Sequence, residues 1–451
     1  MGFRPLIILF FMVIRKMKNI IVCTIVFFST VGFAKAPDES FLSQKTSPVD
    51  EDSPESATEL FGEATQFGSR PWRAPHFQSQ KFPIPSGMER QVNFWKDIYS
   101  KYSTHEGVIH DSEDIDLIYE VVSFKDIEAM SFLTRRQKEK AKQKRVDQVK
   151  ERIISSLKKM DKLKNPSSLD KEERRIWDYF QSHDELDEIR EAAAKDRIRF
   201  QLGQKDRMQL AIYLSGRYIE DFEEIFAEQG LPKELTRLAF VESSYNIMAR
   251  SKVGASGIWQ IMPYTARPYR VMTSAVDGRN DPIQATKIAA KILSSNYKML
   301  GSWPLALTGY NHGPAGVRKM VEKYETRDLG YLVQNVKTRK SFGFASRNFY
   351  ACFLAALDVE SNAKKYFPGI VWSQKLPSDE LKLPRDIKYK DMVKWFDGNE
   401  DHVQIFNPHL TYKVRNYGFV IPKGAKIYIP KSKMNVVLAG LARSGRKLAS
   451  D

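Results

Sequence analysis

Hydrophobic and polar positions divide the 451-residue chain into five stretches with different patterns. Residues 1–36 contain dense apolar runs, and residues 37–84 show no sustained apolar period. Apolar residues then recur at helical spacing through residues 85–216 and again through 217–367. Residues 368–451 carry shorter runs, some of which alternate. The pattern predicts a mostly α-helical protein, with a helical N-terminal region, a helical central domain and a small accessory C-terminal region with short strands.

Residues 1–36 have the features of a signal peptide. The apolar run Ile20–Phe33 follows a short basic cluster, and small residues suitable for cleavage come next at Ala34 and Ala36. The run is shorter than the roughly 20 residues that a membrane-spanning helix needs, which disfavours an uncleaved anchor. We therefore expect a periplasmic or secreted protein that contacts the membrane only if the signal is retained.

Two further stretches precede the central domain. Residues 37–84 are rich in Ser, Pro and acidic residues and predict a disordered tether. Residues 85–216 predict amphipathic helices, one of which contains the basic run Thr134–Met160. This run could bind nucleic acid, but it has no aromatic residue, and its apolar residues keep helical spacing. An ordinary helix with a solvated basic face is the favoured interpretation, and we expect no nucleic-acid partner.

The segment LTRLAFVESSYN places a carboxylate on the apolar side of a predicted helix. Leu235, Leu238 and Ala239 fall at i, i+3 and i+4, and Glu242 occupies the i+7 position of the same stripe. Glutamate is seldom buried without a partner, because removing an ionised carboxylate from water costs several kcal/mol or more. Glu242 is therefore either a structural residue or a residue that takes part in catalysis.

The residues after this helix predict a loop, a second helix and, later, short strands. The segment SKVGASGIWQIMP has glycines and a proline that break the helical period, so it predicts a shaped loop or hairpin. Asp281 and Pro282 read as the N-cap and first residue of a helix that Gly301 ends. Alternation within Leu410–Pro430 predicts a few strands.

Charge and cysteine content narrow the chemistry further. Removing residues 1–34 takes away four positive charges and no acid, which lowers the net charge from +16 to +12. An anionic partner fits this charge, whether nucleic acid, acidic lipid or the peptide stems of a cell wall. Only Cys352 would remain, so no intrachain disulfide can form. The chain lacks the motifs of zinc proteases and phosphate-loop enzymes, and no Gly-x-Ser-x-Gly elbow presents a serine nucleophile, although the order of residues leaves a Ser/His/Asp triad open. We expect no metal and no cofactor.

Three short blocks occur in order within residues 217–367: Glu242–Ser243, Gly257–Pro263 and Tyr310–Gly313. Together they resemble the catalytic domain of the soluble lytic transglycosylases, which are related to goose-type lysozyme. Trp259 and the segment KSFGFASRNFY are most similar to the membrane-bound lytic transglycosylase D branch. No LysM repeat, which that branch usually carries, is recognisable.

The resemblance implies a lysozyme-like helical domain with a small β element, and a role for each matching residue. Glu242 would be the sole acid/base catalyst. Tyr310 and Asn311 would close the site over the glycan, and Ser251 would contact the sugar or orient the glutamate. The expected substrate-binding residues are Ser243, Ser251, Trp259, Gln260, Met262, Tyr310 and Asn311. From the residues alone, Trp259 and Met262 could equally be core residues, and Ser243 could simply hydrogen-bond within its helix.

The implied activity is cleavage of peptidoglycan glycan strands between N-acetylmuramic acid and N-acetylglucosamine, with formation of a 1,6-anhydromuramic end. The segment from Ser243 to Val276 contains no Asp or Glu, so a mechanism with one carboxylate is the simplest hypothesis. The alternatives are a lysozyme-type hydrolase and a non-catalytic peptidoglycan-binding protein of the same fold. The sequence leaves the oligomeric state open.

Overall fold

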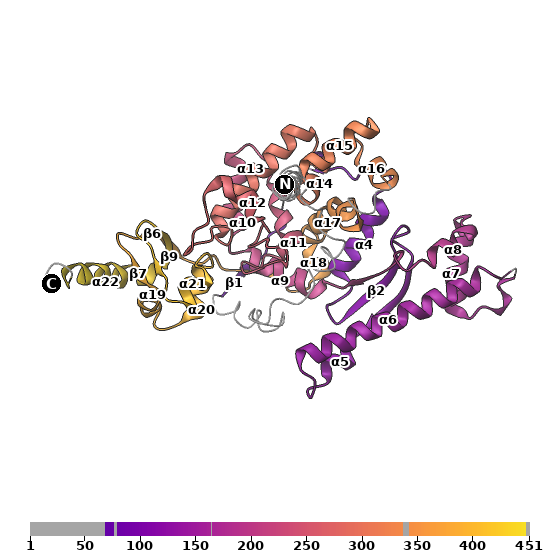
Figure 1. The fold of residues 1–451 in the computed structure, drawn as a ribbon, viewed down its shortest axis with the longest axis horizontal. Helices are drawn as coiled ribbons and strands as arrows, with labels where there is room; N and C mark the ends of the chain where they lie inside the picture. Colours follow the sequence, from indigo (N-terminus) through magenta and orange to yellow (C-terminus); the bar gives the residue numbers. More distant parts are fainter. Residues whose placement is uncertain (1–67, 76–78, 164, 337–341, 448–451) are drawn as a thin grey trace, which may run out of the picture.

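The computed structural model describes residues 68–75, 79–163, 165–336 and 342–447, and these are mostly helical with small sheets (Figure 1). The expectation of a mostly α-helical protein is confirmed. The predicted signal peptide and the first part of the predicted tether lie outside the described residues. Within the described ranges, the structure has no helix that combines the length and the apolar character needed to cross a membrane.

The central domain is built around helix α17 (Phe344–Ser361), which is buried along almost its whole length. Residues such as Phe349, Ala351 and Phe353 are completely buried and form the middle of the largest hydrophobic core. The surrounding helical elements are α10 (Ile219–Glu228), η5 (Lys233–Arg237), α11 (Leu238–Ser243), α13 (Pro282–Leu300), α14 (Trp303–His312), α15 (Pro314–Tyr324), α16 (Leu329–Asn335) and α18 (Ala363–Tyr366).

The ends of α13 are those predicted from the sequence. The Asp281 side chain accepts hydrogen bonds from the backbone N–H groups of Ile283 and Gln284, both at 3.0 Å, and Pro282 is the first helical residue. Gly301 ends the helix with φ of +78°, a left-handed conformation that glycine adopts without steric cost. These caps fix where α13 begins relative to the preceding loop.

Helix α4 (Glu89–Ser100) belongs to the central core, although the sequence places it in a separate N-terminal region. Its buried face, which includes Trp95 and Tyr99, packs against α17. Trp95 Nε1 donates a hydrogen bond to Asn348 Oδ1 of α17 at 3.1 Å. Helix α9 (Lys205–Ser215) also contacts α4. The predicted boundary at residue 217 therefore does not separate two cores.

The rest of the N-terminal region forms an arm that contains a sheet, where the sequence predicts helices only (Figure 1). The antiparallel strand order is β3-β2-β4. Short β-branched runs such as IYEVVS are the signal for it. The strands of the arm are β2 (Glu106–Asp111), β3 (Ile118–Ser123) and β4 (Ile198–Leu202), and its helices are α5 (Lys125–Ala129), α6 (Arg135–Met160), α7 (Lys171–Ser182) and α8 (Ile189–Ala192).

Helix α6 confirms the interpretation of the basic run. It begins at a capping box formed by Thr134 and Gln137, and it buries an apolar stripe that includes Ile153, Leu157 and Met160. This stripe belongs to a second hydrophobic core, together with residues of the sheet and α7. Its basic residues lie mostly on the exposed face.

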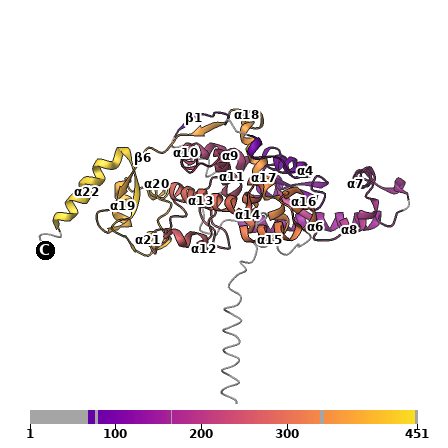
Figure 2. The same cartoon turned by 90° about the horizontal axis from the view of Figure 1, so that it is seen from above.

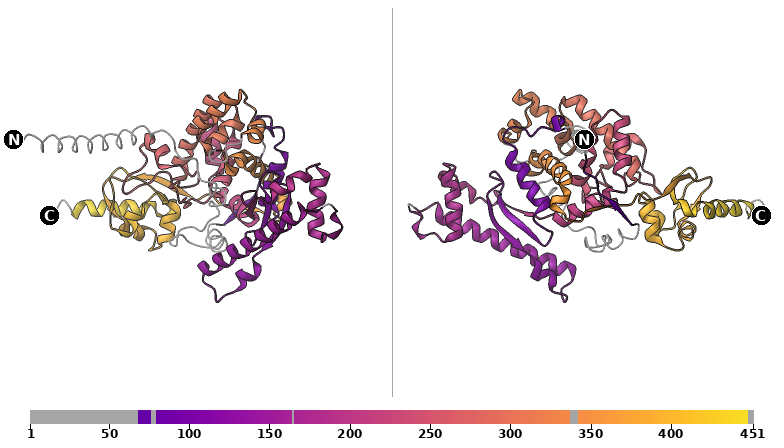
Figure 3. Two further views of the ribbon diagram at one scale, coloured as in Figure 1. Left: turned by 45° about the vertical axis from the view of Figure 1, so that its right-hand side comes forward. Right: turned by 180° about the vertical axis from the view of Figure 1, so that it is seen from behind.

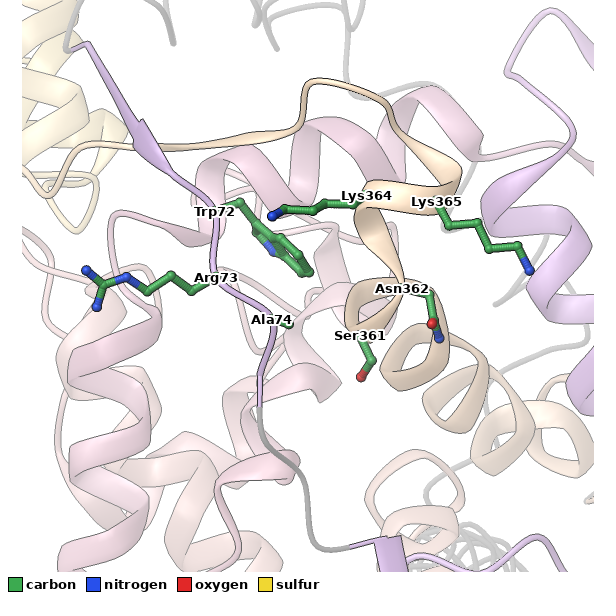
Figure 4. Close-up of a pocket in the computed structure, with 7 residues that line it drawn as sticks. All are labelled: Trp72, Arg73, Ala74, Ser361, Asn362, Lys364 and Lys365. Carbon is green, nitrogen blue, oxygen red and sulfur yellow. The ribbon is translucent and has the colours of Figure 1, made fainter.

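The described part of the predicted tether is packed against the central domain, which corrects that expectation for residues 68–75 and 79–84. Strand β1 (Ser69–Pro71) pairs antiparallel with β5 (Val371–Ser373). Arg70 lies 4.7 Å from the ring centroid of Trp372 and forms an ion pair with Glu220 at 2.7 Å. Trp72 is buried and lines a surface pocket with residues that end α17 and begin α18 (Figure 4). The isolated aromatic residues of this polar stretch are the sequence feature that indicates packing against a core.

The C-terminal region has its own hydrophobic core and lies at the opposite end of the molecule from the arm (Figures 2 and 3). Its elements are β6 (Ser378–Lys382), β7 (Ile387–Lys388), α19 (Tyr389–Trp395), α20 (Glu400–Phe406), α21 (Tyr412–Asn416), β8 (Val420–Ile421), β9 (Lys426–Pro430) and α22 (Met434–Lys447). Strand β6 pairs with β9, and β7 pairs with β8. The predicted strands within Leu410–Pro430 are confirmed for β8 and β9, but the start of that segment is the helix α21.

We expect the protein to lose stability as the pH falls from neutrality towards 5, because of His110 in β2. This ring is completely buried beside Phe94 and Phe344, and burial lowers its pKa from 6.5 to about 3. The positive charges of Arg199 in β4 and Lys150 in α6 act in the same direction. The unfolded chain therefore binds a proton near pH 6.5 that the folded chain does not bind until near pH 3.

This contribution to stability is complete above pH 6.5 and is lost as the pH falls below it, at about 1.4 kcal/mol per pH unit. Urea unfolding at pH 7 and pH 5 should show a decrease of about 2 kcal/mol from this residue. In the variant His110→Asn that part of the decrease should disappear. An equal pH dependence in both proteins would exclude His110 as its source.

Candidate active site

Glu242 lies at the C-terminal end of α11, and only 5% of its surface is exposed. The short helix continues directly from the 3-10 turn η5, and all of its residues from Leu238 to Glu242 are buried. The backbone then reverses through Ser244 and Tyr245, with φ of +53° and +59°. The inward orientation predicted from the i+7 position is confirmed.

Two tyrosines lie close enough to Glu242 for its charge to affect them. Tyr310 comes from α14 and Tyr99 from α4. Burial is the main cause that raises the pKa of each phenol well above its ordinary value, and the negative charge of Glu242 raises both further. Cys352 also contributes to the raised pKa of Tyr99. Both phenols are therefore neutral at physiological pH, and both contribute to the buried surroundings of Glu242.

The sequence pattern does not predict Tyr99 as a residue of this site, because Tyr99 lies 143 positions before Glu242 on a helix expected to belong to another region. Its only local signal is the apolar face of the segment MERQVNFWKDIYSKY. Packing of α4 on α17 brings it to the site. No local pattern encodes that long-range contact.

The loop after α11 is tied to it by side chains that the sequence assigned to substrate binding. Ser243 Oγ donates a hydrogen bond to the carbonyl of Ile258 at 2.8 Å. Ser251 Oγ accepts one from the N–H of Ala255 at 2.9 Å. Gln260, with φ of +45°, donates from Nε2 to two loop carbonyls at 2.9 and 3.0 Å. These three residues fix the shape of the loop, whereas Met262 is half-buried and partly accessible.

The structure corrects the prediction for Trp259, which is a core residue. Its side chain is completely buried and stacks on Phe226 with ring centroids 5.6 Å apart. Its Nε1 donates a hydrogen bond to Thr286 Oγ1 at 2.8 Å. Trp259 contributes to the site through its carbonyl oxygen, which accepts a hydrogen bond from the Tyr310 hydroxyl at 2.9 Å.

Arg279 stabilises the loop through hydrogen bonds, a role that the sequence pattern does not predict. Its Nη1 donates hydrogen bonds to the carbonyls of Gly254 at 2.7 Å and Ile261 at 3.0 Å, and Nη2 pairs with Asp277 at 2.7 Å. Gly257 passes so close that an added Cβ would lie 2.0 Å from the Arg279 carbonyl oxygen. The planar guanidinium can satisfy these partners together, which an ammonium cannot.

We expect Arg279→Ala to loosen the loop and to lower the free energy of unfolding by about 1–3 kcal/mol, since the carbonyls of Gly254 and Ile261 and the carboxylate of Asp277 lose their donor. Limited proteolysis should then cut near Val253, which is exposed in the folded protein. Arg279→Lys should restore only part of the resistance. If cleavage rates of both variants match those of the unaltered protein, Arg279 does not determine the loop conformation.

Asn311 and His312 follow Tyr310 at the end of α14. Asn311 Oδ1 accepts a hydrogen bond from Ser346 Oγ at 3.0 Å, whereas its Nδ2 is buried and has no hydrogen-bond partner among the described residues. Leaving a buried donor unpaired costs free energy. Burial lowers the pKa of His312, which keeps its ring neutral near pH 7.

The two acids that follow Glu242 in the chain have other partners. Asp277 pairs with Arg279, and Asp281 caps α13 while accepting a hydrogen bond from the Tyr428 hydroxyl at 2.9 Å. The predicted role of Asp281 as the N-cap is confirmed. In the part of the chain that the structure describes, no three His, Cys, Asp or Glu side chains are grouped to hold a metal ion.

Comparison with known families identifies the segment that contains this site. Residues 222–331 match the family described as the Transglycosylase SLT domain. This segment is a transglycosylase SLT domain. The SLT domain spans Glu242, the loop, and Tyr310 with Asn311, so the recognition of the soluble lytic transglycosylase family from three short blocks is confirmed.

Individual relatives agree with the SLT domain over part of their length. The chain is 30% identical over 141 residues to membrane-bound lytic murein transglycosylase D of Escherichia coli K12, a match that covers 31% of this chain and 30% of that protein. It is 30% identical over 118 residues to a putative tributyltin chloride resistance protein of Alteromonas sp. strain M-1, covering 25% of this chain and 57% of that protein. The match thus spans less than a third of the first relative.

Solved structures give weaker similarity. An inactive mutant of the lytic transglycosylase Slt from Pseudomonas aeruginosa has a TM-score of 0.29 and 18% identity, over 45% of this chain and 32% of that one. The soluble lytic transglycosylase Slt70 of Escherichia coli has a TM-score of 0.29 and 16% identity, over 54% and 45%. Scores this low carry no argument about the fold of this chain.

Proposed function

We propose that this protein is a peptidoglycan lytic transglycosylase. It would cleave the β-1,4 bond between N-acetylmuramic acid and N-acetylglucosamine and leave a 1,6-anhydromuramic end. The observation that carries the proposal is the buried carboxylate of Glu242 within an SLT domain, whose next acids in the chain, Asp277 and Asp281, are held in other contacts.

The first step is proton donation. Burial favours the protonated form of a carboxyl group, and on this basis we assign to Glu242 the role of general acid. It donates its proton to the oxygen that bridges the two sugars, and the N-acetylglucosamine side leaves as the free alcohol. The 2-acetamido carbonyl of the substrate stabilises the positive charge that develops at the anomeric carbon, in place of a second carboxylate.

The second step uses the same residue as a base. Ionised Glu242 removes the proton from the 6-hydroxyl of the muramic acid, and that oxygen bonds to the anomeric carbon and displaces the acetamido oxygen. The acid is regenerated and no water is consumed. This intramolecular attack exceeds hydrolysis only where the hydroxyl is held close and water is excluded.

The surroundings of Glu242 can meet these two conditions. We assign to Tyr310, Asn311 and Met262 the direct contacts with the glycan, on the basis of their positions and of the unpaired Asn311 amide. Ser243, Ser251 and Gln260 act by fixing the loop that carries the cleft wall. Export to the periplasm or beyond, through the leader predicted for residues 1–36, is part of the same proposal.

A reducing-end assay tests the proposal against hydrolysis by a lysozyme-type enzyme. Digestion of purified peptidoglycan by a transglycosylase should release soluble fragments without an increase in reducing ends, because the cleaved sugar is capped by its own 6-oxygen. Release with a matching increase in reducing ends would assign a hydrolase. Binding of peptidoglycan with no release would favour the non-catalytic alternative.

A further inference from the structure

The C-terminal region carries an exposed group of aromatic side chains around α21, which we call the aromatic patch and define as Tyr412, Tyr417 and Phe419. Their exposed fractions are 43%, 67% and 43%. The rings of Tyr412 and Tyr417 meet edge to face with centroids 5.2 Å apart, and Lys413 Nζ lies 5.6 Å from the Phe419 centroid. Grouped exposed aromatics of this kind mark an interaction surface.

The aromatic patch is joined to the SLT domain beside the loop that follows Glu242. Thr411, directly before α21, donates from its backbone N–H to Ala275 at 3.0 Å and from its hydroxyl to the Ser274 carbonyl at 2.7 Å. Leu410 forms a β-bridge with Val276. In Figure 2, α21 and α12 (Pro263–Ala266), which ends the loop, lie along the same edge of the molecule. Helix α21, which contains Tyr412, therefore lies beside the segment that follows the loop.

Basic residues are frequent on both sides of this junction. The segment Ser243–Val276, which contains the loop, has four basic residues and no acid, and Leu410–Lys433 has six basic residues and no acid. Burial is the main cause that lowers the pKa of Arg415 in α21, and the charge of Arg250 lowers it further, whereas Glu400 in α20 acts in the opposite direction. Lys426, Lys431 and Lys433 pair with acids of neighbouring elements, whereas Lys413 lies over Phe419. A polymer that carries carboxylates fits this surface.

We propose that the aromatic patch is a glycan-binding subsite that holds the peptidoglycan strand beyond the catalytic cleft. The inference rests on the proposed function, because that function supplies the strand. Aromatic faces take up the apolar faces of sugar rings, and Lys413 with Arg415 faces the carboxylates of the peptide stems. The subsite gives the C-terminal region a means of retaining the polymer.

A membrane surface is the main competing partner, because aromatic and basic residues also gather at lipid interfaces. The geometry favours the glycan. Helix α21 has only five residues and cannot present the long amphipathic face that interfacial helices use. The patch is also joined to the domain that carries Glu242, through the contacts of Leu410 and Thr411 with Ser274–Val276.

The test is cosedimentation with purified, insoluble peptidoglycan, using the Glu242→Gln protein so that the polymer is not degraded. The double variant Tyr417→Ala/Phe419→Ala should bind about tenfold more weakly, for the loss of two ring contacts. Lys413→Glu should bind about threefold more weakly, and this difference should shrink at high salt. Phe132→Ala is the matched control, since Phe132 is 78% exposed on the arm and should not affect binding.

Circular dichroism establishes that each variant is folded. If the folded double variant binds peptidoglycan as tightly as the control, the inference is wrong. It is also wrong if the double variant loses binding to phosphatidylglycerol vesicles while its binding to peptidoglycan is unchanged. Failure of the proposed function would appear elsewhere, as the absence of fragment release by the protein with Glu242 intact.

Discussion

Replacing Glu242 by Gln should leave the protein folded and reduce the release of soluble peptidoglycan fragments by about a hundredfold to ten-thousandfold. The amide keeps the size and shape of the buried carboxyl group but cannot donate and recover a proton. Because the proposed mechanism uses this residue in both steps, no other group is expected to compensate. The rate of fragment release, measured at equal concentrations of folded protein, gives the result.

Glu228→Gln serves as the matched control, because Glu228 lies exposed at the end of α10 in the same domain. It should retain the activity of the unaltered protein. Thermal unfolding of both variants should occur within a few degrees of the unaltered chain. A Glu242→Gln protein that still releases fragments at the original rate would remove Glu242 from the mechanism.

The second large effect is on stability. Arg237, directly before α11, is 1% exposed, and its guanidinium contacts the fully buried carboxylate of Glu360 at 2.7 and 3.3 Å and also pairs with Glu223. Arg237→Ala leaves Glu360 without this partner inside the core. We expect a loss of about 3–5 kcal/mol in the free energy of unfolding, because an uncompensated buried charge is costly. Denaturation in urea measures it.

Two comparisons separate this cause from simple loss of side-chain volume. The double variant Arg237→Met/Glu360→Met removes both charges and should recover more than half of the lost stability. Arg318→Ala breaks the exposed pair with Glu322 and should cost less than about 1 kcal/mol. If the double variant is as unstable as Arg237→Ala, packing rather than charge explains the loss.

The sequence predicts the local features of the site well, because they depend on short-range rules. The i+7 position of Glu242, the cap at Asp281 and the end of α13 at Gly301 follow from helical spacing and backbone geometry. The same rules explain why α6 is a helix despite its high charge. Each of these conclusions needs only a few consecutive residues.

Long-range packing accounts for what the sequence did not predict. Tyr99 lies near Glu242 only because α4 packs on α17. Arg279, which precedes α13, contacts the loop only because the fold brings these two segments together. The alternation in GIWQIMP does not determine which side chains face a cleft, and Trp259 turned inward onto Phe226. In the arm, short β-branched runs paired into a sheet through contacts between β2 and β4, which are about ninety positions apart.

The most direct test of the proposed mechanism is mass spectrometry of the soluble fragments that the mature protein releases from purified peptidoglycan, with Glu242→Gln as the control. We expect muropeptides that end in 1,6-anhydromuramic acid, each one water lighter than the hydrolysed equivalent, and we expect none of them from the control. Fragments that end in reducing muramic acid, or anhydro fragments that persist in the control, would contradict this mechanism.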